Sequence, residues 1–331
     1  MNIFYNDEIP VDAWEEFLEQ NSHATPFQSY EFYKLFNSVP GLSAQAIAVC
    51  EEHKILSLVV ITFQKGPGLK SFFSRRSIIY GGPLIEDAYP DALDLLLKTI
   101  LTITKNQSIY TETRNLSDYS KHKDIFMKIG FKYIPYLNFH LSTDNPEDLT
   151  TKMSNSRMRQ IKKAQSSGVS WKEAGSVEEV KVFYNILSGL YKNKIHKPLL
   201  PLSFFINFFY SNIGKYLLVW YLNEIIGGIM CPILKERAIY EFYVCGLDDE
   251  YKAQYPSVIA TWAAIEYASR NKIPVFDFMG AGKPDESYGV RDFKSRFGGE
   301  LIEFGRFIKI CDPFLYKIGE SGLNLLSHIG K

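Results

Sequence analysis

Hydrophobic residues recur every three or four positions in some stretches of the chain and alternate or run together in others. The first spacing is typical of amphipathic helices and the second of strands. Helical spacing predicts helices at 11–20, 29–36, 91–104, 117–128, 154–168, 177–191, 203–211, 256–271 and 290–296. Strand-like runs predict strands at 45–50, 55–63, 77–80, 108–113, 131–141, 215–222, 225–234, 238–245, 275–278 and 301–310. Because both kinds of element occur along the whole chain, the pattern predicts a mixed α/β (α+β) fold.

The two halves of this predicted order end in the same way, with a helix, a glycine and a long strand. The first ending reads MKIGFKYIPYLNFHL and the second reads SRFGGELIEFGRFIK. Strands followed by helix, strand, helix and strand are also the order of an N-acetyltransferase (GNAT-like) domain, so we expect a tandem duplication of that unit. The polar run Asp144-Asn145-Pro146-Glu147 interrupts the pattern. The sequence therefore predicts two tandem GNAT-like domains, at 1–145 and 146–331.

Composition and charge narrow the classes of function. The chain carries 37 Lys and Arg against 37 Asp and Glu, and this zero net charge argues against a surface built for broad nucleic-acid binding. Its first ten residues lack the pattern of a signal peptide, and no apolar run reaches the roughly 20 residues of a membrane span. The four cysteines are widely spaced, without a zinc or disulfide pattern. We expect a cytoplasmic protein without a metal site.

A glycine-rich loop and the short helix after it carry the first candidate chemistry. The predicted strand at 275–278 leads into a GAG loop that begins at Gly280, at a sheet edge of the kind where open α/β sheets bind ligands. Lys294 follows Phe293 on the next helix, with Arg291 before it. A lysine held beside aromatic rings would offer a cation to developing negative charge. The alternative is a tight turn with solvated charges.

A basic helix at 154–168 is the second candidate. Its apolar residues fall near one face, and Arg157, Arg159, Lys162 and Lys163 spread over the rest. These side chains would bind the phosphates of a tRNA or of a nucleotide-linked substrate. They would equally suit a solvated outer face, and both interpretations stay open.

Tyrosines gather at the turn before the predicted helix at 256–271. Tyr243 and Tyr255 are the two that would line a pocket or donate a hydrogen bond to a reacting carbonyl. Ordinary packing is the alternative for both.

Three motifs resemble those of the FemABX family of peptidoglycan aminoacyltransferases. The most specific one spans 276–305 and includes DFMG at 277–280, FKSRFG at 293–298 and Gly305. The second is SRMRQIKKA at 156–164, and the weaker third is FQSYEF at 27–32. Together with the two predicted domains, the resemblance covers nearly the whole chain.

The resemblance implies an acyltransferase that moves an amino acid from aminoacyl-tRNA to an amine of a peptidoglycan precursor, either UDP-linked or lipid-linked. It implies no bound cofactor, because aminoacyl-tRNA is the co-substrate. Lys294 would stabilise charge in the transition state. Lys34 stands where some members place a lysine that contacts the substrate, and a solvated lysine on a helix is the favoured alternative. The expected catalytic residues are Lys294, Phe293, Tyr243 and Tyr255, and the expected substrate-binding residues are Lys34, Arg157, Arg159, Lys162, Gly280 and Arg291.

Two features depart from the family pattern. Members that bind the precursor diphosphate use an arginine four residues before a tyrosine, where this sequence has Leu200 and Phe204. The helical arm that some members insert for tRNA contact is not found in this sequence. The first departure weakens the expectation of the usual precursor as acceptor.

A second hypothesis is an acyl-CoA-dependent N-acyltransferase that acts on a cell-surface sugar or polysaccharide precursor. Such enzymes bind the CoA pyrophosphate at a glycine-containing loop before a helix. The corresponding segment at 247–257 has no glycine, which disfavours acetyl-CoA as the donor. A binding module that has lost the reaction is a third hypothesis. The amphipathic segment at 314–329 would pack on the body or make a peripheral membrane contact.

Overall fold

The structure, a computed structural model, describes residues 1–52, 54–66 and 70–319. The chain divides into two compact units. Unit 1 comprises Met1–Pro135 together with the segment that begins at Phe304, and unit 2 comprises Tyr136–Glu303. Each unit contains an eight-stranded sheet within these described residues. The predicted mixed α/β fold is confirmed.

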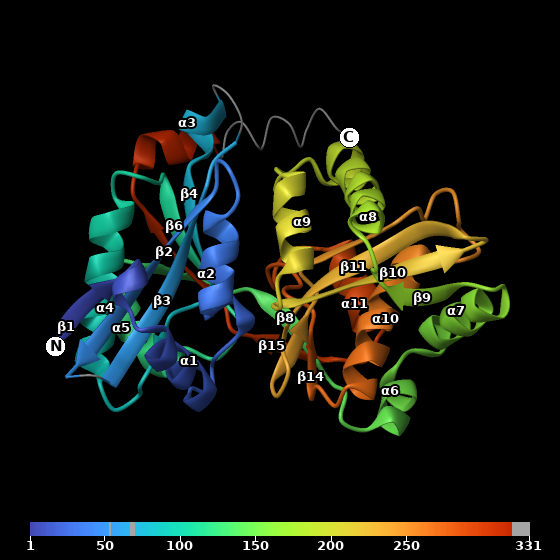
Figure 1. Cartoon of the computed structure of the whole chain (residues 1–331), viewed down its shortest axis with the longest axis horizontal. Coiled ribbons are helices and arrows are strands. Elements are labelled where there is room, and N and C mark those ends of the chain that lie inside the picture. The colour runs from blue at the N-terminus through green and yellow to red at the C-terminus, as the bar shows by residue number, and fades with distance from the viewer. Residues whose placement is uncertain (53, 67–69, 320–331) are drawn as a thin grey trace. The chain divides into compact units, whose positions relative to one another are not determined.

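The sheet of unit 1 has the strand order β1-β2-β3-β4-β6-β16-β7, with β5 beside β3. Its strands are β1 (Asn2–Tyr5), β2 (Ser43–Glu51), β3 (Lys54–Gln64), β4 (Arg76–Gly81), β5 (Leu84–Ile85), β6 (Tyr110–Asn115), β7 (Lys132–Ile134) and β16 (Arg306–Ile310). Its helices are η1 (Asn6–Glu8), α1 (Val11–Gln20), η2 (Pro26–Gln28), α2 (Tyr30–Asn37), α3 (Lys70–Ser74), α4 (Pro90–Thr104), η3 (Ser120–His122) and α5 (Lys123–Lys128). Helices α1 and α2 lie on one face of the sheet and α4 and α5 on the other (Figure 1).

The core of unit 1 forms where α4 packs on β2 and β3. Leu93, Leu97 and Ile100 of α4 are fully buried against Ile47 and Val59 of the sheet. Their spacing of three or four residues places them on one face of the helix, because an α-helix has 3.6 residues per turn. Burial of this apolar face stabilises the helix on the sheet.

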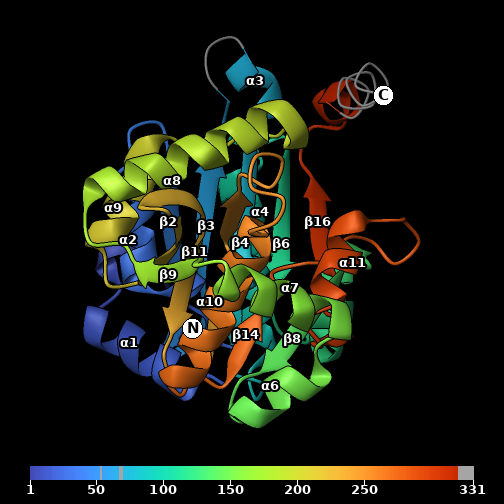
Figure 2. The same cartoon turned by 90° about the vertical axis from the view of Figure 1, so that its right-hand side faces the viewer.

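The sheet of unit 2 has the strand order β15-β8-β14-β12-β11-β10-β9, with β13 beside β11. Its strands are β8 (Leu137–Ser142), β9 (Ser170–Glu173), β10 (Gly214–Tyr221), β11 (Glu224–Leu234), β12 (Ala238–Tyr240), β13 (Tyr243–Gly246), β14 (Val275–Asp277) and β15 (Glu300–Glu303). Its helices are α6 (Pro146–Lys152), α7 (Asn155–Ser166), α8 (Val177–Leu190), η4 (Tyr191–Ile195), α9 (Leu202–Tyr210), α10 (Pro256–Arg270) and α11 (Gly289–Ser295). In Figure 2, α7, α10 and α11 of this unit face the viewer.

The two long strands expected at 131–141 and 301–310 are each broken, and their halves lie in different sheets. The first becomes β7 and β8 around Pro135, and the second becomes β15 and β16 around Gly305. Strand β16 pairs with β6 and β7 in unit 1, whereas β8 pairs with β14 and β15 in unit 2. Gly305 adopts a positive φ of 64° against the Tyr133 ring, which an added Cβ would overlap.

This exchange of strands changes the domain boundaries. We expected one boundary between residues 145 and 146, but the compact units divide after Pro135 and again after Glu303. The polar run at 144–147 follows β8 inside unit 2. The physical reason is that backbone pairing, and not a polar linker, decides which sheet each half-strand joins.

Candidate active site

The candidate site of unit 2 lies at the carboxyl ends of β12 and β14, which are parallel. Strand β12 ends at Tyr240 and β14 at Asp277. The strand expected at 238–245 is interrupted at Glu241 and Phe242, after which β13 pairs with β11. Glu241 therefore lies where the parallel pair ends, at the kind of sheet edge where open α/β folds bind ligands.

Lys294 on α11 extends its side chain to Glu241 at the end of β12. Its Nζ donates to the carbonyl oxygen of Phe278 at 2.5 Å and to that of Gly280 at 2.9 Å, and it lies 3.0 Å from Oε1 of Glu241. The lysine is only 7% exposed. Since an ammonium group has three N–H donors, these three partners satisfy it. In this arrangement Lys294 joins α11 to the loop, and its expected contact with reacting groups stays a prediction.

Glu241 is the buried partner of Lys294, and none of the sequence motifs includes it. Its Oε2 accepts a hydrogen bond from the Thr261 hydroxyl at 3.2 Å, and its backbone N–H donates to the Asp277 carbonyl at 2.9 Å. A single carboxylate inside the apolar run 238–245 was the available signal. A buried charge requires a partner of opposite charge, although the sequence does not say which one.

Asp277 organises the backbone that follows β14. Its carboxylate accepts from Asn138 Nδ2 at 2.8 Å and from the backbone N–H of Met279 at 2.6 Å, and it lies 2.8 Å from His140 Nε2. Oδ1 of Asn138 in turn accepts from the Gly280 N–H at 2.7 Å. Met279 and Gly280 both adopt positive φ, at 56° and 119°. The hydrogen bonds therefore hold a loop in a conformation that a free chain rarely adopts.

Gly280 and Arg291, both expected to bind substrate, are part of this framework. Gly280 uses its N–H for Asn138 and its carbonyl for Lys294. Arg291 donates from Nε to the Ala281 carbonyl at 2.9 Å, and its other nitrogens donate to the carbonyls of 283 and 284. Arg291 thus ties α11 to the glycine-rich loop, and its position supports loop geometry more directly than substrate contact.

Arg157 and Phe293 also form an internal contact. The Arg157 guanidinium lies 4.4 Å from the ring centres of both Phe293 and Phe297, and donates to the Phe293 carbonyl and to Gln160 Oε1, each at 2.8 Å. The side chain is 2% exposed, and burial, together with the nearby Arg296, lowers its pKa to about 10. Arg157 thus joins α7 to α11, and its expected phosphate contact stays a prediction. Phe293 packs in the same contact.

The other cations of α7 lie on its exposed face. Arg159, Lys162 and Lys163 are exposed, and Nζ of Lys163 lies 5.8 Å from the centre of the Tyr255 ring. Tyr255 precedes α10 with a φ of 50°. Tyr243, in contrast, belongs to an aromatic cluster with Phe205 and Phe242, at ring distances of 5.1 and 4.8 Å.

An aspartate occupies the N-terminus of α10. Oδ1 of Asp248 accepts from the backbone N–H of Ser257 at 3.2 Å, and Oδ2 accepts from the Ser257 hydroxyl. Free N–H groups at a helix N-terminus attract anions, and here a carboxylate of the chain itself fills that position. Gly246 lies close by, where an added Cβ would be 2.6 Å from the Ser257 nitrogen.

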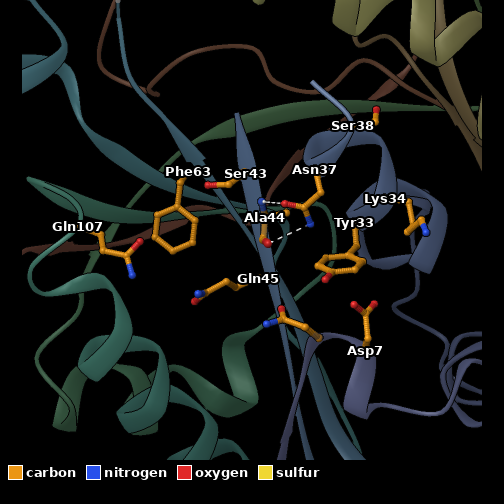
Figure 3. Close-up of a pocket in the computed structure, with 11 residues that line it drawn as sticks. Asp7, Tyr33, Lys34, Asn37, Ser38, Ser43, Ala44, Gln45, Phe63 and Gln107 are labelled. Carbon is orange, nitrogen blue, oxygen red and sulfur yellow. Dashed lines mark hydrogen bonds between the residues drawn. The ribbon is translucent and has the colours of Figure 1, made fainter. Parts of the chain in front are cut away.

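Lys34 lines a polar cavity of about 500 Å³ in unit 1. Figure 3 shows Lys34 and Asn37 on α2, with Asn37 joined to the backbone of Ala44 by two hydrogen bonds of 3.0 and 3.1 Å. Gln45 lies beside them, and its buried Oε1 has no hydrogen-bond partner within the described residues. The lining therefore carries one cation, Lys34, and one carboxylate, Asp7.

Leu200 and Phe204, which replace the arginine and tyrosine of some family members, are buried apolar side chains. Neither can contact a phosphate. In the part of the chain that the structure describes, no helix is long and apolar enough to cross a membrane. No group of three or more His, Cys, Asp or Glu side chains among those residues is placed to hold a metal ion.

Comparisons with known proteins agree with this architecture. The model of the FemAB family matches residues 233–321, which include Glu241, the glycine-rich loop and Lys294. A search of curated proteins gives no significant match. Among solved structures, FemX aligns with a TM-score of 0.71 at 14% identity, covering 96% of this chain and 99% of FemX.

Two further structures share the arrangement at lower similarity. A tandem GNAT protein from the clavulanic acid biosynthesis pathway aligns with a TM-score of 0.58 at 10% identity, covering 94% of this chain and 99% of its own. The C-terminal domain of a putative lysylphosphatidylglycerol synthetase from Agrobacterium fabrum aligns at 0.56 and 9% identity, covering 90% of each chain. The chain thus shares the fold of FemX and of a tandem GNAT protein, and its segment 233–321 matches the FemAB family model.

Proposed function

We propose that this protein is an aminoacyltransferase that moves an amino acid from aminoacyl-tRNA to an amine of a peptidoglycan precursor. The main support is the match of the FemAB family model to residues 233–321, the segment that holds the Glu241–Lys294 pair and its loop. In this reaction the amine attacks the ester carbonyl, the ester C–O bond breaks, and the tRNA hydroxyl leaves with the proton that the amine gives up. The protein must align the two substrates and stabilise the oxyanion.

The framework around Lys294 suits the alignment role. Lys294, Asp277 and Asn138 hold the backbone from 277 to 280 through hydrogen bonds at both its N–H and carbonyl groups. Such a loop does not need to reorganise when substrate binds. Lys294 is therefore a positioning residue in this proposal, and Tyr243 or Tyr255 is the proposed donor to the oxyanion.

The donor is proposed to be aminoacyl-tRNA because of two features of unit 2. Arg159, Lys162 and Lys163 leave an exposed basic face on α7, next to Tyr255, which suits RNA phosphates. Asp248 fills the N-terminus of α10 with negative charge, which would repel a pyrophosphate. The second feature disfavours the alternative, an acyl-CoA-dependent N-acyltransferase acting on a cell-surface sugar or polysaccharide precursor.

The acceptor is proposed to contact unit 1 at the polar cavity beside Lys34. The lysine is exposed on α2 and would donate to a phosphate or carboxylate of the precursor. Because Leu200 and Phe204 are buried and apolar, that contact would not involve their positions.

A transfer assay tests this proposal. Purified protein is incubated with total tRNA charged with labelled amino acids, and with a UDP-linked or a lipid-linked peptidoglycan precursor. We expect label to move to the precursor, with acetyl-CoA giving no product. Transfer by Lys294→Met should fall at least roughly tenfold because its loop is no longer held, while Lys181→Met, an exposed lysine of α8, should match the wild type. Acylation that depends on acetyl-CoA, with no transfer from any charged tRNA, would favour the alternative.

A further inference from the structure

Helix α3, in the connection between β3 and β4 of unit 1, carries two exposed aromatic side chains. Phe72 and Phe73 are 52% and 50% exposed, and their rings pack edge to face with centres 5.3 Å apart. The guanidinium of Arg75 lies 4.6 Å from the Phe72 ring centre, and its Nε donates to the Phe72 carbonyl at 3.3 Å. The tip of this connection therefore presents apolar rings with a cation beside them.

A second exposed apolar stripe follows β16. Residues 313–319 are helical, and Phe314 and Ile318, four residues apart on one side of that helix, are 73% and 40% exposed. Leu315 is buried, and Tyr316 packs against Tyr110 with ring centres 5.8 Å apart. One side of this helical segment, with Leu315 and Tyr316, is thus packed, and the side with Phe314 and Ile318 is exposed to solvent.

The two features lie at the same end of the unit 1 sheet. Arg76 at the start of β4 and Ile310 at the end of β16 are both register partners of Tyr110, one on each side of it. Helix α3 comes just before Arg76, and residues 313–319 come just after Ile310. Figures 1 and 2 both draw α3 and these helical residues at this end of the unit. We call Phe72, Phe73, Arg75, Phe314 and Ile318 the aromatic end.

Charge at the aromatic end is positive. The sequence from 64 to 76 contains four basic residues and no acidic one, and Lys317 is exposed beside Phe314. Two acidic residues flank these helical residues in the sequence, Asp312 and Glu320, and Glu320 lies outside the described residues. Asp312 uses Oδ1 to accept from the backbone N–H groups of Phe314 and Leu315. Among the described residues next to the rings in the sequence, Lys65, Arg75, Arg76 and Lys317 thus outnumber the one carboxylate, Asp312.

We infer that the aromatic end docks on the surface of a bilayer that contains anionic phospholipids. Exposed phenyl rings insert at the boundary between headgroups and acyl chains, and neighbouring Lys and Arg side chains bind anionic headgroups. Both contacts are available at the same end of the sheet. The lining of the Lys34 cavity includes residues at that end too, because Ser43 and Phe63 are register partners at the ends of β2 and β3. On the proposed function, docking would hold the acceptor site next to the headgroups.

Co-sedimentation with vesicles tests this inference without any enzyme assay. The full chain is mixed with vesicles of phosphatidylcholine alone or with about one third phosphatidylglycerol. We expect at least roughly tenfold stronger partition into the anionic vesicles, partly reversed by high salt. The double variant Phe72→Ser/Phe73→Ser should lose roughly tenfold in partition, since two half-exposed rings no longer insert. Arg75→Ser should lose less.

The matched control is Tyr210→Ser, because Tyr210 is 72% exposed on α9 of unit 2 and lies outside the aromatic end. This variant should partition like the wild type, and all variants should keep the wild-type melting temperature. Equal partition of the wild type into both kinds of vesicle would overturn the inference. A wild-type dimer that becomes a monomer in the Phe72→Ser/Phe73→Ser variant, measured by light scattering, would also overturn it, because a second copy of the chain would then cover the rings. Failure of the transfer assay alone would leave vesicle binding unaffected.

Discussion

Nζ of Lys294 lies 3.0 Å from Oε1 of Glu241, and both side chains are almost completely buried. The pair joins α11 to the end of β12, so removal of either charge would leave the other uncompensated. We expect Lys294→Met to lower the free energy of unfolding by about 3–5 kcal/mol. The combined variant Lys294→Met/Glu241→Gln should be less destabilised than the sum of the two single variants. Urea unfolding followed by fluorescence measures this coupling.

The control for this cycle is Lys181→Met, which breaks the exposed pair of Lys181 and Glu178 on α8. An exposed pair contributes at most about 1 kcal/mol, so this change should be nearly neutral. If Lys294→Met proves as mild as Lys181→Met, the buried pair does not hold the loop.

Because Asp248 fills the N-terminus of α10, we can predict how the melting temperature of the protein responds to phosphates. Its carboxylate accepts from the Ser257 N–H and hydroxyl at the start of α10. We expect neither inorganic pyrophosphate nor acetyl-CoA to raise the melting temperature of the wild type. Asp248→Gly should lose about 1 kcal/mol of stability with the cap, and should gain a saturable response to pyrophosphate because the N–H groups become available. A pyrophosphate response already present in the wild type would contradict the assigned role of Asp248.

The lowered pKa of Glu112 leads us to expect a smaller free energy of unfolding in acid. Burial alone would raise its pKa, but Arg114 and Arg306, with Nη1 of Arg306 2.7 Å from Oε1, lower it from 4.5 to about 2. A lowered folded-state pKa stabilises the protein above the unfolded value, and the contribution disappears as the pH falls from about 4.5 to about 2. The shift corresponds to about 3 kcal/mol. Urea unfolding at pH 6 and pH 3 should show this loss in the wild type.

The comparison is between Glu112→Gln and Glu15→Gln, an exposed carboxylate on α1. Glu112→Gln should be less stable than the wild type at pH 6 and should show a smaller difference between the two pH values. Glu15→Gln should keep the wild-type dependence. Because Arg306 belongs to the exchanged strand β16, this measurement also reports on how that strand is held in the sheet. An unchanged pH dependence in Glu112→Gln would mean that other carboxylates cause the acid loss.

Local patterns located the elements well and the sheet topology poorly. The helix expected at 11–20 is α1, Val11–Gln20, because three of its apolar positions face the core and repeat at helical spacing. The same reasoning joined β7 with β8 and β15 with β16, since each pair forms one apolar run. Alternation of side chains reports that a segment is extended, but not which sheet it pairs with. That choice depends on contacts between residues far apart in the chain.

The candidate site shows the same limit. The motifs predicted Lys294 and Arg157 as site residues. Lys294 lies on α11 and Arg157 contacts that helix from α7, yet both are buried against partners that local sequence does not specify. Glu241 and Phe278 for the lysine, and the carbonyl of Phe293 for the arginine, come from other elements. The sequence does not show whether a basic side chain is solvated or is buried in an ion pair with a carboxylate. The sequence therefore does not distinguish a cation that contacts substrate from one that supports the loop.

We expect a substitution of Arg157 that keeps the positive charge to destabilise unit 2 nevertheless. Its planar guanidinium lies between the rings of Phe293 and Phe297 and also binds a carbonyl. A lysine keeps the charge but can neither stack on two rings nor donate with the same geometry, so Arg157→Lys should cost about 2 kcal/mol. Arg159→Lys on the exposed face of the same helix should stay within about 0.5 kcal/mol. Equal effects in urea unfolding would contradict the internal position of Arg157.

The exposed face of α7 predicts the salt dependence of tRNA binding. Arg159 and Lys162 are exposed, and neither forms an ion pair with another described residue, so both charges are available to phosphates. Arg159→Ala/Lys162→Ala should weaken binding of uncharged tRNA, measured by fluorescence anisotropy. The slope of log K against log salt should fall by about 1 for each phosphate that the variant no longer neutralises. Lys181→Ala should leave the affinity and the slope unchanged. If the double variant keeps the wild-type slope, tRNA does not bind this face, and the basic helix is a solvated surface.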